Sequence, residues 1–125
     1  MIERGLSGTF ETAVEERHTA HALGNTGVHV LATPSLTHFC QRAAADTLRP
    51  HLQDGQMVLG LRNTVRHLKA SPRGGVVRLT ATVQTVDDDQ ITLSVEAVSG
   101  GITLMSGTHQ CRIVDRAAFL AAAGA

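Results

Sequence analysis

TPSLTHFCQRAAADTL, residues 33–48, is the stretch that decides the fold. Its apolar side chains recur every three or four residues and therefore line one face of a helix. That face consists of Leu36, Phe39, Cys40, Ala43, Ala44, Thr47 and Leu48. Thr33 is predicted to cap the helix and Pro34 to take its first position, where a missing N–H costs nothing. The small alanines keep the helix narrow, so a curved sheet is able to wrap closely around it.

On both sides of this helix the hydrophobic pattern changes to the alternation typical of β-strands. Before it, Leu6–Val14 is predicted to be an edge strand and Val28–Leu31 a short strand. After Gly55, four long antiparallel strands are expected at residues 57–68, 75–86, 91–98 and 102–114. Asp115 is predicted to cap a short C-terminal helix.

One long helix followed by a meander of strands predicts an α+β fold, with a single domain over residues 1–125. The most economical packing lays the helix across the concave face of one curved antiparallel sheet. Such a sheet leaves unpaired edges and a half-covered face, so we expect a homodimer.

Composition excludes several classes of function. Eleven Lys and Arg balance eleven Asp and Glu, and only 2% of residues are aromatic, which disfavours nucleic-acid binding by phosphate contacts or base stacking. No apolar run is long enough for a membrane helix, and the polar start at Met1 has no signal-peptide character, so a cytoplasmic location is expected.

Cys40 and Cys111 are interpreted as reduced and structural, with a disulfide or a reactive thiol as the alternatives. The histidines follow no metal-ligand spacing, and His18 and His21 fall in a segment predicted to be extended, so no metal site is expected.

Three polar residues stand out as candidates for chemistry. Thr33 lies at a helix N-terminus, where free N–H groups favour a developing negative charge. Gln41 lies two turns further on, and His67 lies late in the following strand. Each has a plain structural alternative: an ordinary N-cap for Thr33, a solvated or dimer-facing position for Gln41, and a packed strand residue for His67.

Four segments resemble hotdog-fold thioesterases of the fluoroacetyl-CoA thioesterase type. Two belong to the central helix, Ala32–Ala44 at its start and Thr47–Leu52 at its end. The others are Thr64–Gly74, with a histidine followed by an Ala-x-Pro-x-Gly turn, and Ser106–Gln110 in the last strand. The likeness extends over roughly residues 27–114, and its best support is the joint spacing of Thr33, Gln41 and His67.

The resemblance implies hydrolysis of an acyl thioester by a threonine, a glutamate and a histidine. By position, the threonine corresponds to Thr33, the histidine to His67 and the glutamate to Gln41. A neutral amide neither attacks a thioester nor acts as a base, although it does donate a hydrogen bond to a thioester oxygen or hold a water. Asp46 does not substitute, because five residues turn a helix by ~500° and leave it ~140° away from Gln41.

The implied substrate is a thioester of CoA or of an acyl-carrier protein, with no cofactor. Arg66, Lys69 and Arg73 surround the end of the histidine strand and are candidates for binding the CoA phosphates, or else form a solvated basic surface. Two other functions stay open on the same fold. One is a module that binds acyl thioesters without cleaving them. The other is a dehydratase, which the absence of a carboxylate at Gln41 disfavours.

Overall fold

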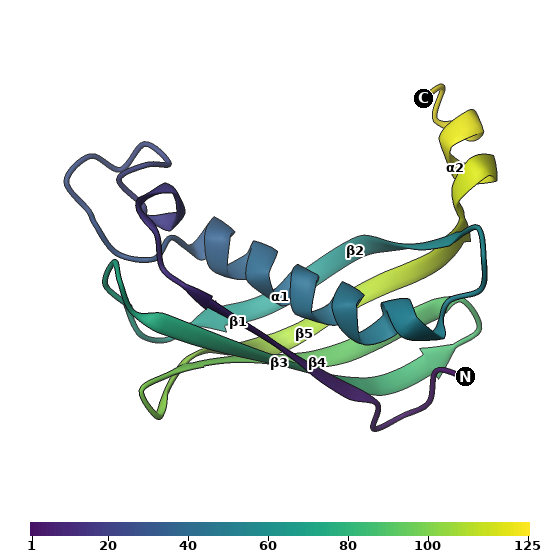
Figure 1. The fold of residues 1–125 in the computed structure, drawn as a ribbon, viewed down its shortest axis with the longest axis horizontal. Coiled ribbons are helices and arrows are strands. Elements are labelled where there is room, and N and C mark those ends of the chain that lie inside the picture. The colour runs from purple at the N-terminus through teal and green to yellow at the C-terminus, as the bar shows by residue number, and fades with distance from the viewer.

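The computed structural model describes residues 1–125 and contains one five-stranded antiparallel sheet with a long helix across it (Figure 1). The strands are β1 (Ser7–Ala13), β2 (Gln56–His67), β3 (Val76–Asp87), β4 (Gln90–Ser99) and β5 (Ile102–Asp115). The helices are α1 (Thr33–Leu48), α2 (Arg116–Ala122) and two 3-10 turns, η1 (Glu16–His18) and η2 (Arg49–His51). The strand order is β1-β3-β4-β5-β2, so β1 and β2 form the two edges.

The core lies between α1 and the sheet. The apolar face predicted for the helix is buried throughout, from Leu36 at 0% exposure to Leu48 at 0%. Alternate residues of β3 and β4 meet it from the sheet, including Val77, Leu79 and Leu93. The predicted α+β fold, a curved sheet around one central helix, is therefore confirmed (Figure 1).

Two local predictions need correction. Residues 28–31 do not form a strand, and make only isolated bridges between Val30 and Pro72 and between Leu31 and Thr19. Thr33 does not cap α1, because Ala32 is extended (φ −76°, ψ 145°) and takes the cap position, so Thr33 is the first helical residue. By contrast, Asp115 caps α2 as predicted, since its carboxylate accepts the Ala118 N–H at 2.8 Å.

A close approach and a bulge shape the pairing of β2 with β5. Gly107 lies opposite Val65, and a Cβ on Gly107 would come within 2.1 Å of the Thr64 carbonyl oxygen. Only glycine fits there. The register shifts between Gly60 and Arg62, which leaves Leu61 as the extra residue of a bulge. This shift turns the second half of β2 so that Asn63, Val65 and His67 share the helix-facing side.

No helix of the structure is both long and apolar enough to cross a membrane.

Candidate active site

The start of α1 and the end of β2 bring a hydroxyl and an imidazole together. Thr33 Oγ1 lies 2.7 Å from His67 Nδ1, a hydrogen bond between residues 34 positions apart in the sequence. Thr33 is free to make it because the cap position belongs to Ala32 and its hydroxyl has no capping bond to make. Thr33 is exposed, whereas His67 is half-buried and its Nε2 is buried without a hydrogen-bond partner. The hydroxyl is thus the accessible end of the pair.

The helix end adds an electrostatic element to this pair. The amides of Thr33 and Ser35 donate no backbone hydrogen bond, and Pro34 between them has no N–H. Free N–H groups and the partial positive charge of a helix N-terminus stabilise negative charge in their vicinity. A hydroxyl, a proton acceptor and an end that favours an anion therefore meet at one place.

Gln41 lies in a different part of the chain. It follows Thr33 by eight residues on α1, which corresponds to ~12 Å along the helix axis. Its amide rests on Gly60 of β2, because a Cβ built on Gly60 would lie 3.1 Å from Gln41 Nε2 and 3.4 Å from His109 Cε1. The structure brings Thr33 and His67 together and separates Gln41 from both.

The neighbours of Gln41 include a polar pair that the sequence interpretation missed. His109 Nδ1 lies 2.6 Å from Asn63 Oδ1, and the two residues are directly opposite in the β2–β5 register. His109 is 1% exposed, and this burial lowers its pKa, because it penalises the charged imidazolium. The signal was present in the alternation of β5, which aligns His109 with the apolar Met105 and Cys111 on the core-facing side.

Two adjoining hollows lie at the Thr33 end of α1. One, of about 240 Å³, is lined by His18, Leu23, Pro34, Ser35, His38 and Phe39. The other, of about 280 Å³, shares His18, His38 and Phe39 and continues to β1. A further hollow of about 260 Å³ lies at the opposite end of the helix, between Ala45 and Arg116, far from the hydroxyl–imidazole pair.

Comparison with known proteins identifies the family of this chain. The family model for the fluoroacetyl-CoA-specific thioesterase FlK matches residues 14–117. The chain belongs to this thioesterase family. A fluoroacetyl-CoA thioesterase from Streptantibioticus cattleyicolor is 29% identical over 85 residues, which are 68% of this chain and 61% of that protein. The sequence match therefore spans less than two thirds of that relative.

Solved structures extend the likeness over nearly the whole chain. A structure of the fluoroacetyl-CoA thioesterase FlK has a TM-score of 0.92 at 25% identity, covering 98% of this chain and 96% of that one. A thioesterase superfamily member from Thermus thermophilus has a TM-score of 0.90 at 26% identity, covering 98% and 90%. A hot-dog-like protein from Thermanaerovibrio acidaminovorans, at 19% identity, shares the fold with a TM-score of 0.90, over 98% of this chain and 90% of that one.

The three cations proposed for phosphate binding in this FlK-family chain lie in different settings. Arg66 precedes His67 in β2, so its side chain leaves the opposite face of the sheet. Lys69 lies just beyond the strand beside a hollow of about 290 Å³. Arg73 donates to Glu16 Oε2 at 2.5 Å. Their role in substrate binding stays a prediction.

Asp46 and the two cysteines of this FlK-family chain are engaged or buried. Asp46 forms ion pairs with Arg42 and Arg49 and faces neither Thr33 nor His67. Both cysteines are unpaired and buried, as expected for structural thiols. Burial raises the pKa of Cys40 to about 12 and that of Cys111 to about 11, because a thiolate is poorly solvated there. Neither is a nucleophile at neutral pH.

Proposed function

We propose that this protein hydrolyses an acyl thioester carried by CoA or by an acyl-carrier protein. The observation that supports this most directly is the 2.7 Å contact between Thr33 Oγ1 and His67 Nδ1 in a chain of the FlK family. The relatives named fluoroacetyl-CoA thioesterase support CoA as the carrier. The aliphatic composition, with only 2% aromatic residues, favours an acyl chain over an aromatic acid.

In the proposed mechanism, His67 is the general base and Thr33 relays the proton to it. With its proton on Nε2, the neutral imidazole has a lone pair on Nδ1 to receive the Thr33 proton. As that proton moves, Thr33 Oγ1 takes a proton from water, and the water oxygen bonds to the thioester carbon. The carbon–sulfur bond then breaks, and His67 returns its proton to the leaving thiolate. The free amides of Thr33 and Ser35 stabilise the negative charge on the carbonyl oxygen.

Gln41 joins this reaction only from a second copy of the chain, because ~12 Å of helix separates it from Thr33. We therefore propose a homodimer in which Gln41 of one chain completes the Thr33–His67 pair of the other. The open edge of β2 supports this, since β2 pairs only with β5 and exposes Leu61 by 49%, and Leu68, just beyond the end of β2, is 47% exposed. In this dimer, Gln41 donates to the thioester oxygen or holds the water.

Mixing two inactive variants tests the shared site. When Thr33→Val and Gln41→Ala chains are unfolded and refolded together, a dimer with shared sites regains one intact site per mixed dimer. Activity then returns to about a quarter of the wild-type value, because about half of the dimers are mixed. A site contained in one chain regains none. Sedimentation that finds only monomer at micromolar concentration would also overturn the dimer.

Thiol release from a panel of acyl-CoAs, with fluoroacetyl-CoA and acetyl-CoA included, tests the reaction itself. His67→Ala should lower kcat/KM by ~10²-fold or more, the usual contribution of a positioned base. His51→Ala is the matched control, because His51 is an exposed histidine at the other end of α1. Activity of His67→Ala within a few-fold of wild type would contradict the mechanism.

A second function rests on Gln41 itself. Where the family resemblance implies a carboxylate, this chain has an amide that has no charge to supply. If hydrolysis needs that carboxylate, this protein binds acyl-CoA without cleaving it. Saturable acyl-CoA binding by calorimetry without thiol release would favour this second function over hydrolysis.

The CoA phosphates are proposed to contact Arg66, Lys69 and Arg73. Substituting each by alanine should raise KM for acyl-CoA and leave kcat nearly unchanged, because a phosphate contact contributes equally before and during the reaction. A change in kcat alone would argue against this role.

A further inference from the structure

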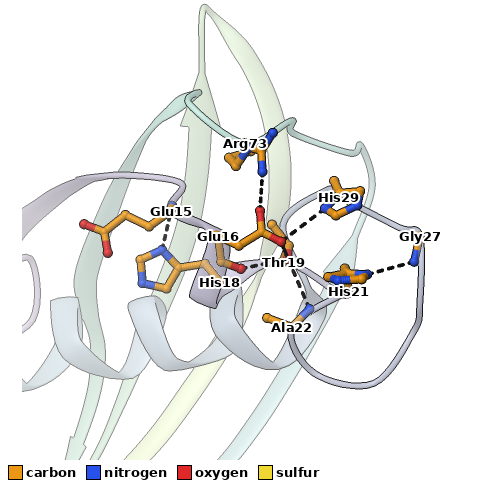
Figure 2. Close-up of polar contacts among 9 residues, drawn as sticks. All are labelled: Glu15, Glu16, His18, Thr19, His21, Ala22, Gly27, His29 and Arg73. Carbon is orange, nitrogen blue, oxygen red and sulfur yellow. Dashed lines mark hydrogen bonds and ion pairs between the residues drawn. The ribbon is translucent and has the colours of Figure 1, made fainter.

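Three segments converge near the start of α1, the first two consecutive in the sequence and the third distant from them (Figure 2). The first is η1, which carries Glu16. The second is the loop after it, which folds back on itself through hydrogen bonds from His21 N to the Val28 oxygen (2.7 Å) and from Ala20 N to the Val30 oxygen (2.9 Å). The third is the β2–β3 connection with Arg73, whose guanidinium reaches Glu16.

This folding gathers three ligand-type side chains. Because the loop doubles back, His21 and His29 stack with ring centroids 4.3 Å apart. His29 Nδ1 lies 3.1 Å from Glu16 Oε1. One ligand atom from each of Glu16, His21 and His29 lies within 4.8 Å of the others. The sequence interpretation expected no metal site because the histidines follow no ligand spacing and because His18 and His21 fall in a segment predicted to be extended. That segment instead forms η1 and the start of the loop, and the structure places His29 beside His21.

We propose that Glu16, His21 and His29 form a binding site for a divalent transition metal, with Zn²⁺ as the best match. Two imidazoles and one carboxylate suit zinc, and exclude Mg²⁺ and Ca²⁺, which prefer all-oxygen sites. Zinc bonds to nitrogen and oxygen are ~2.0–2.2 Å long, so neighbouring ligand atoms in a tetrahedron lie ~3.3 Å apart. The 3.1 Å between His29 Nδ1 and Glu16 Oε1 matches this spacing.

The protons and lone pairs of the cluster are consistent with metal binding. The hydrogen bond between His29 Nδ1 and Glu16 Oε1 holds one proton, which the metal replaces. His21 Nδ1 accepts the Gly27 N–H at 2.9 Å, so the neutral ring carries its proton on Nε2, and a metal bound at Nε2 replaces that proton as it does at His29.

Arg73 fits as an outer partner of the ligand Glu16 (Figure 2). It binds Oε2 and leaves Oε1 to the metal, and its hydrogen bond holds the pKa of Glu16 below the usual value, which keeps the carboxylate ionised. Ligating carboxylates in metal sites are commonly hydrogen-bonded in this way. The bound metal fastens the loop of residues 19–30 to η1 and, through Arg73, to the β2–β3 connection that follows His67.

Calorimetric titration of the EDTA-treated full chain with Zn²⁺ tests the site. We expect one Zn²⁺ per chain with a Kd of ~1 µM or below at pH 7.5, and no saturable heat with Mg²⁺. His29→Ala and His21→Ala should each weaken the binding of Zn²⁺ by ~10²-fold, and His51→Ala should not change it. Melting without metal shows that the variants fold, and Zn²⁺ should raise the Tm of the wild type and of His51→Ala only.

Several outcomes would overturn the site. One is no saturation by ~100 µM Zn²⁺, and another is more than one weak site per chain, which would mean adventitious surface binding. Equal loss of affinity in His51→Ala and His29→Ala would also refute it. These outcomes leave the proposed thioester hydrolysis untouched, because the titration does not measure activity.

Discussion

Replacing Thr33 by valine tests the central contact of the site with little change in shape. Valine keeps the branched shape and replaces the hydroxyl, whose Oγ1 lies 2.7 Å from His67 Nδ1, by a methyl group. The position is exposed and lies in the first turn of α1, so packing is unaffected. Losing one hydrogen bond lowers the free energy of unfolding by ~1 kcal/mol, and hence Tm by roughly 3–5 °C. Losing the proton relay lowers kcat by ~10²–10⁴-fold.

Two further variants separate the hydroxyl from local structure. Thr33→Ser keeps the relay and should retain activity within ~10-fold of wild type. Thr37→Val is the matched control, because the Thr37 hydroxyl donates to the Thr33 carbonyl oxygen at 2.9 Å and does not contact His67. Initial rates of thiol release at several acyl-CoA concentrations give kcat and KM separately. Thr33→Val within a few-fold of wild type, or an equal loss in Thr37→Val, would refute the reasoning.

Three other predictions concern position 41, the buried thiols and the buried histidine. Gln41→Glu should raise kcat, and the rate should increase with pH as the new carboxyl ionises. A pH–rate profile measures this, and no gain in kcat at any pH would contradict a hydrolytic role for position 41. Cys40 and Cys111 should not react with a disulfide reagent at pH 8 in the native protein and should both react after unfolding, because burial raises each pKa; rapid native labelling would show that the core opens. Because burial lowers the pKa of His109 below that of the unfolded chain, its contribution to stability is present above about pH 6.5 and is lost as the pH falls below it. Urea titrations between pH 5 and 8 should show that the free energy of unfolding of His109→Gln changes less with pH than that of the wild type. The part due to His18 remains, because burial lowers the pKa of His18 as well. An equal change with pH in both proteins would contradict the assignment to His109.

The family resemblance suggested one site for Thr33, Gln41 and His67, whereas the structure separates them into two places. Sequence spacing says how far apart residues are along the chain and not where a helix and a strand cross. The eight residues from Thr33 to Gln41 are a fixed length of helix, so Gln41 lies over Gly60 rather than at His67. Only the assembled chain, or the proposed dimer, decides which residues meet.

The long elements were predictable because burial on one face imposes a local pattern. α1 and the strands β1 to β5 follow from periodicities of three to four and of two residues, and the Asp115 cap from a bond only three residues long. The short strand expected at Val28–Leu31 failed because these residues find isolated bridge partners, Pro72 and Thr19, and no long strand beside them. A segment of four residues is too short for its hydrophobic pattern to show whether a long partner strand is available.

The sequence by itself therefore determined the helix, the strands, the curved-sheet architecture and two members of the candidate site. Tertiary structure decided every contact made across long stretches of chain. The Thr33–His67 bond spans 34 residues, the Asn63–His109 pair spans 46, and the ion pair between Glu16 and Arg73 spans 57. The first uses a hydroxyl that had been predicted to cap the helix, the second depends on the register that follows the Leu61 bulge, and the third holds Glu16 of the proposed metal site. Local periodicity reports which face of an element is buried, whereas the meeting of two polar side chains depends on the register and crossing of whole elements, which no local pattern records.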